Sequence, residues 1–219
     1  MIRCGRSVIL GVLAFLPLTA LGAGAARQEF REALSRTANA AHGEELFQGS
    51  CRACHGSKGQ GVDDGSVPAI AAQHCRVLVK QLVDFRSRQR WDIRMEHFAD
   101  REHLPGAQDL ADLAAFVSSL PPQPTRRWGS GEYLRAGASV YFAGCERCHG
   151  SSGQGDGAAL VPRLAGQHFD YLVRQMQDSA DGRRPSMSAA HVRLIRGMDR
   201  EGILGVADYL SRSSPPPAP

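Results

Sequence analysis

The sequence has little net charge, few aromatic residues, and no long hydrophobic run after its first 26 residues. Its 219 residues include 26 Lys and Arg against 22 Asp and Glu, a formal net charge of +4, and only 6% are aromatic. This balance is too weak to predict nucleic-acid binding, which usually needs a concentrated basic face. The lack of hydrophobic runs excludes a polytopic membrane protein. With 42% hydrophobic and 22% charged residues, the composition also excludes collagen-like and wholly disordered chains.

Residues 1–26 have the three parts of a secretory signal peptide. Arg3 and Arg6 form a positive start, an apolar stretch covers residues 8–21, and small residues close the segment. The apolar stretch has only about 14 residues and is interrupted by Pro17, whereas about 20 are needed to span a bilayer. An uncleaved anchor is the alternative. We therefore expect cleavage, export to a bacterial periplasm, and a mature chain with 24 basic and 22 acidic residues.

The chain contains an internal repeat with a period of 94 residues. When residues 41–85 are aligned without gaps to residues 135–179, 18 of the 45 positions are identical. The repeat predicts two tandem domains, covering residues 27–122 and 123–212, with a proline-rich boundary and a disordered tail at 213–219. A domain of about 95 residues buries a marginal apolar area on its own. We therefore expect a further group to help fill each core.

The motif Cys-x-x-Cys-His occurs once in each copy and predicts covalent attachment of haem c. Two thiols three positions apart lie on one helical turn, within reach of the two vinyl groups of a haem, and the next residue can place an imidazole nitrogen on the iron. The residues are Cys51, Cys54 and His55 in the first copy, and Cys145, Cys148 and His149 in the second. A thioredoxin-like pair would need a βαβ pattern, which is missing, and paired zinc motifs usually lie about 15–20 residues apart. A disulfide within the motif would close too short a loop to constrain the chain.

Two methionines are candidates for the sixth iron ligand. Met95 and Met187 each follow the motif histidine by about 40 residues. We interpret Met187 as lying in a loop before the last helix, with Met95 at the same place in the first copy. A thioether prefers ferrous iron and raises the reduction potential. We interpret Met176 and Met198 as core residues.

Two prolines follow the motif histidines at the same distance in both copies. A ligating imidazole needs its second nitrogen hydrogen-bonded, which fixes the ring and tunes the metal. The backbone at Pro68 and Pro162 is a candidate acceptor, and a simple turn proline is the alternative.

The remaining histidines receive other interpretations. We expect His74 and His168, which repeat, to lie at the haem edge or the surface. His191 is an alternative iron ligand, because it follows Met187 by four residues. His97 and His103 have no counterparts in the second copy, and we expect His42 to cap a helix or face solvent.

Taken together, these motifs resemble class I cytochrome c, and more closely the dihaem cytochrome c4 type, over nearly all of residues 40–212. The resemblance implies an all-α fold of two tandem domains, each wrapped around one covalently bound haem with His/Met iron. In that family the first helix of each domain packs across the last. Gly43 and Phe47, then Gly137 and Tyr141, are suitably placed for this crossing. The first copy carries about three extra residues, around positions 102–108, before its final helix.

The resemblance implies an electron carrier in the periplasm and not an enzyme. Its redox partners would be an oxidase, a cytochrome complex or a dehydrogenase, with any membrane association made through a partner. Docking would use basic pairs such as Arg183 and Arg184, or Arg193 and Arg196. The alternative is a dihaem enzyme that converts thiosulfate or peroxide at a labile or open haem. Cys75, the one mature cysteine outside the motifs, is interpreted as a small buried or partly exposed thiol, with an intermolecular disulfide or a redox role near the haem as alternatives.

Overall fold

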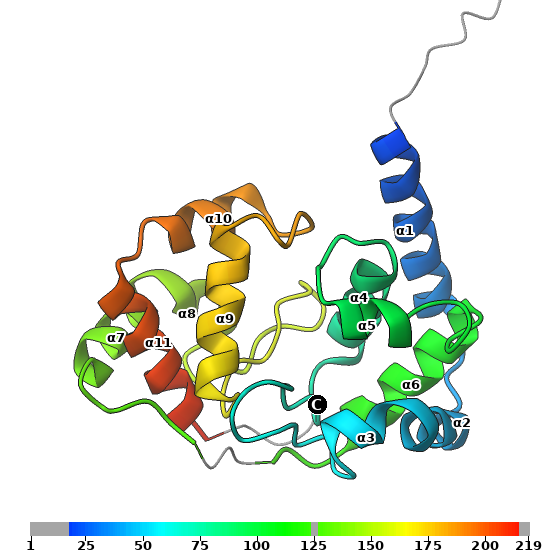
Figure 1. Ribbon diagram of the computed structural model, residues 1–219, viewed down its shortest axis with the longest axis horizontal. Helices are drawn as coiled ribbons and strands as arrows, with labels where there is room; N and C mark the ends of the chain where they lie inside the picture. Colours follow the sequence, from blue (N-terminus) through cyan, green and yellow to red (C-terminus); the bar gives the residue numbers. More distant parts are fainter. Residues whose placement is uncertain (1–17, 124–126, 215–219) are drawn as a thin grey trace, which may run out of the picture.

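The computed structural model describes residues 18–123 and 127–214, with side chains from residue 24 onward. Within these ranges the chain forms eleven α-helices and no β-strand, and one isolated bridge pairs Asp156 with Val161. The helices form two halves that lie side by side, one for each copy of the repeat (Figure 1). The expected all-α fold is therefore confirmed. The expected disordered tail lies almost wholly outside the described residues.

The two halves have the same order of helices, apart from one additional helix at the start of the first. The first half contains α1 (Leu18–Ser35), α2 (Ala40–Leu46), α3 (Arg52–His55), α4 (Cys75–Arg86), α5 (Ile93–Phe98) and α6 (Ala107–Ser119). The second contains α7 (Leu134–Val140), α8 (Glu146–His149), α9 (Phe169–Ala180), α10 (Ala189–Arg196) and α11 (Arg200–Arg212). In each half one π-helical turn, Phe47–Cys51 or Tyr141–Cys145, leads into the helical turn that carries the motif histidine.

In each half, the helix before the motif turn crosses the last helix at a glycine, α2 over α6 and α7 over α11. A Cβ atom on Gly43 would lie 2.0 Å from the backbone oxygen of Asp112 in α6, and one on Gly137 would lie 1.9 Å from the backbone carbon of Gly205 in α11. Only glycine permits such close backbone contact. Next to each crossing a pair of aromatic side chains fills the core. In the second domain the fully buried Tyr141 packs against Tyr209. The crossing expected from the family resemblance is therefore present in both halves.

Helix α1 packs against α4 and α6 of the first domain. Ala33 is buried, and Glu29 forms an ion pair with Arg86 at 2.5 Å in which both side chains are about nine-tenths buried. The helix runs without a break through position 26, the end of the expected signal peptide. Among the residues that the structure describes, no helix combines the length and apolarity needed to cross a bilayer.

The two domains contact each other through reciprocal hydrogen bonds. His74 Nε2 donates to the carbonyl of Gln154 at 2.8 Å, and its counterpart His168 Nε2 donates to the carbonyl of Gln60 at 2.8 Å. Since each bond is repeated with both partners shifted by 94 residues, the two copies are related by an approximate twofold axis. His168 is fully buried at this junction. Of the two expected positions, the surface is therefore wrong for this histidine, and the haem edge stays a prediction.

Candidate haem-binding sites

The attachment motif forms the same short helical turn in both domains. The turn ends immediately after the histidine, at Gly56 with φ of 76° and at Gly150 with φ of 79°, a backbone region that favours glycine. His55 and His149 are buried at the end of their turns. In each motif the first cysteine is partly buried and the second is exposed, and all four thiols are free. Burial raises the pKa of the Cys51 thiol to about 11 and also raises the pKa of Cys145.

Each motif histidine is oriented by the proline carbonyl expected from the sequence. Nδ1 of His55 lies 3.1 Å from the carbonyl oxygen of Pro68, and Nδ1 of His149 lies 3.1 Å from that of Pro162. A carbonyl can only accept, so Nδ1 carries the proton and Nε2 keeps its lone pair for a metal. Burial lowers the pKa of both imidazoles, against the effect of these hydrogen bonds, and so favours the neutral ligand form. The proline acceptors are confirmed.

The two candidate methionine ligands lie in different local structures. Met95 is in the short helix α5, whose cap Asp92 accepts hydrogen bonds from the backbone of Arg94 and Met95. Met187 lies in a turn before α10, its backbone N–H donating to the carbonyl of Arg184 at 2.9 Å. We expected Met95 and Met187 to lie in equivalent loops before the last helix of each domain, and that expectation was therefore wrong. Besides burial and the Pro68 hydrogen bond, the charge of Arg94 lowers the pKa of His55 and that of Asp92 raises it.

The structure brings His191 close to the second motif histidine. The ring centroids of His149 and His191 are 6.1 Å apart, and Nδ1 of His191 is buried with no hydrogen-bond partner. Burial lowers the pKa of His191, which favours a neutral ring. His191 therefore stays a competitor of Met187 for the second iron.

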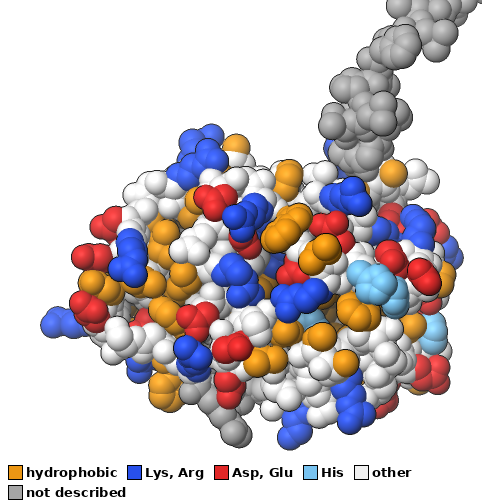
Figure 2. Space-filling view, viewed as in Figure 1, with side chains coloured by type: hydrophobic (Ala, Val, Ile, Leu, Met, Phe, Trp, Pro, Cys, Tyr) orange, Lys and Arg blue, Asp and Glu red, His pale blue; other side chains and the backbone are white. Residues whose placement is uncertain are grey.

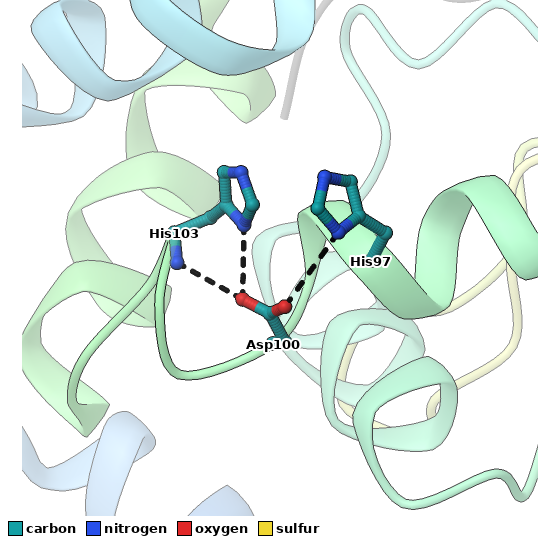
Figure 3. Close-up of side chains that lie close together, drawn as sticks. All are labelled: His97, Asp100 and His103. Carbon is teal, nitrogen blue, oxygen red and sulfur yellow. Dashed lines mark hydrogen bonds and ion pairs between the residues drawn. The ribbon is translucent and has the colours of Figure 1, made fainter.

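Three other histidines contact aspartates of the first domain. In the first domain His97, at the end of α5, and His103, in the following turn, both face the carboxylate of Asp100 (Figure 3). His42 in α2 contacts Asp112 of α6, with 2.9 Å between its Nδ1 and a carboxylate oxygen. It neither caps its own helix nor only faces solvent, because it joins the two crossing helices.

Two arginines related by the repeat lie together at the domain junction. Arg90 donates to Gln81 and Gln175, both at 2.6 Å, and Arg184 donates to Gln175 at 3.2 Å and Gln81 at 3.1 Å. Burial and the neighbouring Arg90 lower the pKa of Arg184 to about 10, and its buried Nε has no partner. Arg184 is thus held at the domain junction, and only Arg183 of this expected docking pair is exposed. This cluster of two arginines and two glutamines was not predicted from the sequence, although each arginine and each glutamine matches its counterpart at the 94-residue period.

The donor set of each site fits haem c. Two free thiols and a neutral imidazole with Nε2 available are the groups that attach the porphyrin and bind its iron. Cys75, at the start of α4, packs against the first-domain core, and burial raises the pKa of its thiol. Cys75 is partly buried, which agrees with its interpretation as a small buried or partly exposed thiol.

Comparisons with known proteins identify the same family in both halves. The sequence model of the cytochrome c family matches residues 40–121 and 134–211. Cytochrome c4 of Azotobacter vinelandii is 32% identical over 155 residues, which covers 61% of this chain and 69% of the relative. The thiosulfate dehydrogenase electron acceptor of Stutzerimonas stutzeri is 29% identical over 198 residues, covering 81% of this chain and 89% of the relative.

A solved structure has the same arrangement of helices. The crystal structure of reduced cytochrome c4 from Pseudomonas stutzeri superposes with a TM-score of 0.70, covering 81% of this chain and all of that one. The sequence identity is 24%, so this likeness bears on the fold alone.

Proposed function

Because the chain belongs to the cytochrome c family and is of the dihaem cytochrome c4 type, we propose that it carries electrons between redox proteins in the periplasm. Two haem c groups are its cofactors. The observation that carries the proposal is the duplicated motif turn, in which each buried histidine has Nδ1 held by a proline carbonyl at 3.1 Å. A carrier needs both irons fully coordinated, and it needs no substrate pocket.

At each site, different residues of this chain attach the haem and bind its iron. When bound, haem supplies an iron that alternates between the ferrous and ferric states. Cys51 and Cys54, or Cys145 and Cys148, hold the porphyrin through thioethers. His55 and His149 bind iron through Nε2, while the fixed Nδ1 bond keeps the ring in one orientation and raises its basicity. Met95 and Met187 complete the coordination and favour the ferrous state.

The exposed side chains around the junction suit a redox partner. Between α10 and α5, basic and apolar side chains alternate over the middle of the surface in Figure 2. Trp91 and Ile93 are exposed in the first domain, as are Arg193 and Leu194 of α10 in the second, and the guanidinium of Arg183 lies over the ring of Trp91. A mixed apolar and basic face favours brief, salt-sensitive association. We propose a periplasmic dehydrogenase as donor, supported by the relative named as an electron acceptor of thiosulfate dehydrogenase, and a terminal oxidase as acceptor.

Carbon monoxide distinguishes a carrier from an enzyme with an open haem. It binds ferrous haem only where the sixth position is free or weakly held. We expect the visible spectrum of the dithionite-reduced protein to stay unchanged under carbon monoxide at neutral pH. A shift in half of the haem absorbance would reveal one labile site and favour the thiosulfate- or peroxide-converting alternative.

The proposed location is tested by the mass of the mature protein. Cleavage after residue 26 predicts a chain that begins at Arg27 in the periplasmic fraction. It would keep the last nine residues of α1, including Glu29 and Ala33, on the first domain. A full-length chain recovered with the membranes would support the uncleaved anchor instead.

A further inference from the structure

Each domain binds the peptide unit that orients the motif histidine of the other domain. Nδ1 of His55 bonds to the carbonyl of Pro68, and the N–H of the same peptide unit belongs to Ala69. This N–H donates to Oε1 of Gln167, from the second domain, at 3.0 Å, and Nε2 of Gln167 donates back to the carbonyl of Ala69 at 2.7 Å. One glutamine thus binds both polar groups of Ala69.

The reverse contact has the same form. Nδ1 of His149 bonds to the carbonyl of Pro162, and the N–H of that peptide unit belongs to Arg163. It donates to Oε1 of Gln73, from the first domain, at 2.9 Å, and Nε2 of Gln73 donates to the carbonyl of Arg163 at 3.0 Å. Because each amide meets one donor and one acceptor, its orientation is fixed by the backbone that it binds.

These bonds form a chain that runs from imidazole through peptide to glutamine. An N–H that donates a hydrogen bond polarises its own peptide carbonyl and makes it a stronger acceptor, by roughly 10–30% per bond. A stronger acceptor at Nδ1 raises the basicity of the imidazole and favours the ferric state of a bound iron. Each glutamine therefore acts on the potential of the haem in the opposite domain.

We propose that Gln167 is a positioning residue for His55, and that Gln73 is a positioning residue for His149, so that each domain tunes the other's iron. The proposal deepens the proposed function and rests on iron ligation by His55 and His149. It predicts a crossed effect, which an ordinary role in holding the domains together would not produce.

The test is a redox titration of the holoprotein in which NMR signals of the two haems are assigned and followed separately. In Gln167→Leu we expect the ferric-to-ferrous ratio of the first haem at fixed potential to fall about threefold, equivalent to a rise of about 30 mV at 59 mV per tenfold. In Gln73→Leu the second haem should shift instead. Tyr171→Phe is the matched control, since it removes another interdomain hydrogen bond, 2.5 Å from Arg90, and should shift neither haem selectively.

Equal shifts in both haems, shifts in the variant's own domain, or no shift would overturn the proposal. Should the leucine variants not fold, Gln167→Glu keeps an acceptor for the N–H of Ala69 and makes it stronger, so the potential of the first haem should fall more than that of the second. A rise or no change in the potential of the first haem in that variant would also refute the proposed effect of Gln167 on His55. Failure of histidine ligation is recognised separately, because the wild-type spectra would then lack low-spin haem.

A second observation concerns the segment after Met95. One nitrogen each of His97 and His103 and one oxygen of Asp100 lie within 4.8 Å of one another (Figure 3). Nδ1 of His103 is 2.9 Å and Nδ1 of His97 is 3.8 Å from the carboxylate. Ligands of tetrahedral zinc lie about 3.3 Å apart, given bonds of about 2.0–2.1 Å. The backbone N–H groups of Glu102 and His103 already hold the carboxylate in place, at 2.9 and 3.0 Å.

We infer that these three side chains form a site for a divalent transition metal, with two imidazoles and a carboxylate as zinc prefers. A bound ion would join the end of α5 to the turn before α6. Calorimetric titration of the oxidised holoprotein with zinc, which exchanges no electrons with haem, should show one equivalent bound. His103→Gln and His97→Gln should each weaken that binding at least tenfold, whereas His74→Gln should not. No binding, or binding that both cluster variants retain, would overturn the assignment.

Discussion

Replacing Gly137 by alanine should destabilise the second domain selectively. The added Cβ would lie 1.9 Å from the backbone of Gly205, whereas ordinary contacts of this kind are 3.4–4 Å. The obstructing atoms are backbone, so no side chain can turn aside, and α7 must move away from α11 by about 1.5 Å or more. That movement would loosen the contact of Tyr141 with Tyr209, whose rings are 5.2 Å apart.

The expected cost follows from this geometry. Overpacking a tight core costs about 1–3 kcal/mol, and a clash of backbone with backbone belongs at the upper end of that range. A loss of about 3 kcal/mol is a change on the order of 100-fold in the folding equilibrium of the domain. With a denaturant dependence of about 2 kcal/mol per molar, the midpoint in guanidinium chloride should fall by about 1.5 M.

The assay is guanidinium unfolding of the holoprotein, with the NMR signals of each haem reporting its own domain. Gly144→Ala is the matched control in the same domain, because its Cβ would meet only the end of the Leu194 side chain, at 3.3 Å. Gly43→Ala, with its Cβ 2.0 Å from the oxygen of Asp112, should move the effect to the first domain. If Gly137→Ala and Gly144→Ala gave equal midpoints, the backbone-contact reasoning would be refuted.

Three further changes have defined outcomes. In Met187→Ala we expect the second iron to take His191 as its ligand, giving low-spin spectra without the methionine signal, whereas His191→Ala should leave that signal intact. The pair of His42 and Asp112 raises the pKa of the histidine and lowers that of the carboxyl. This pair therefore stabilises the fold most where the carboxyl is ionised and the imidazole is protonated. The stabilisation is lost as pH falls below about 4, and again as pH rises through the raised histidine pKa above 6.5. The loss of stability caused by His42→Asn should therefore be smaller at pH 8.5 than at pH 5.5 in urea unfolding. Glu29→Gln should cost about 3 kcal/mol in thermal or urea unfolding, because it leaves its buried arginine partner without a counter-charge. An unchanged first-domain midpoint would show that this ion pair does not stabilise the fold.

The features that the sequence predicted are those fixed by short-range geometry. The motif turn and the proline acceptors at Pro68 and Pro162 depend on residue types at set spacings, and the repeat showed each of them twice. The crossing at Gly43 is a long-range contact, and only the family resemblance implied it. The helix around Met95 was not predicted, because the signal for α5 is the single cap Asp92 ahead of a mixed-polarity segment. The close approach of His191 to His149 depends on how α10 packs, which no local pattern records.

The interface between the domains was visible in the repeat, although it was not interpreted in this way. Two copies related by a twofold axis meet through the same surface on each, so a residue that contacts the partner copy is constrained in both. Polar identities outside the haem motif, at Gln73 and Gln167 and at His74 and His168, lie at the junction. Positions that differ, such as Cys75 against Phe169, pack within their own domain instead. An alignment of the chain with itself can therefore separate residues that bind the cofactor from residues that bind the other copy, because the second group is polar, identical and distant from the motif.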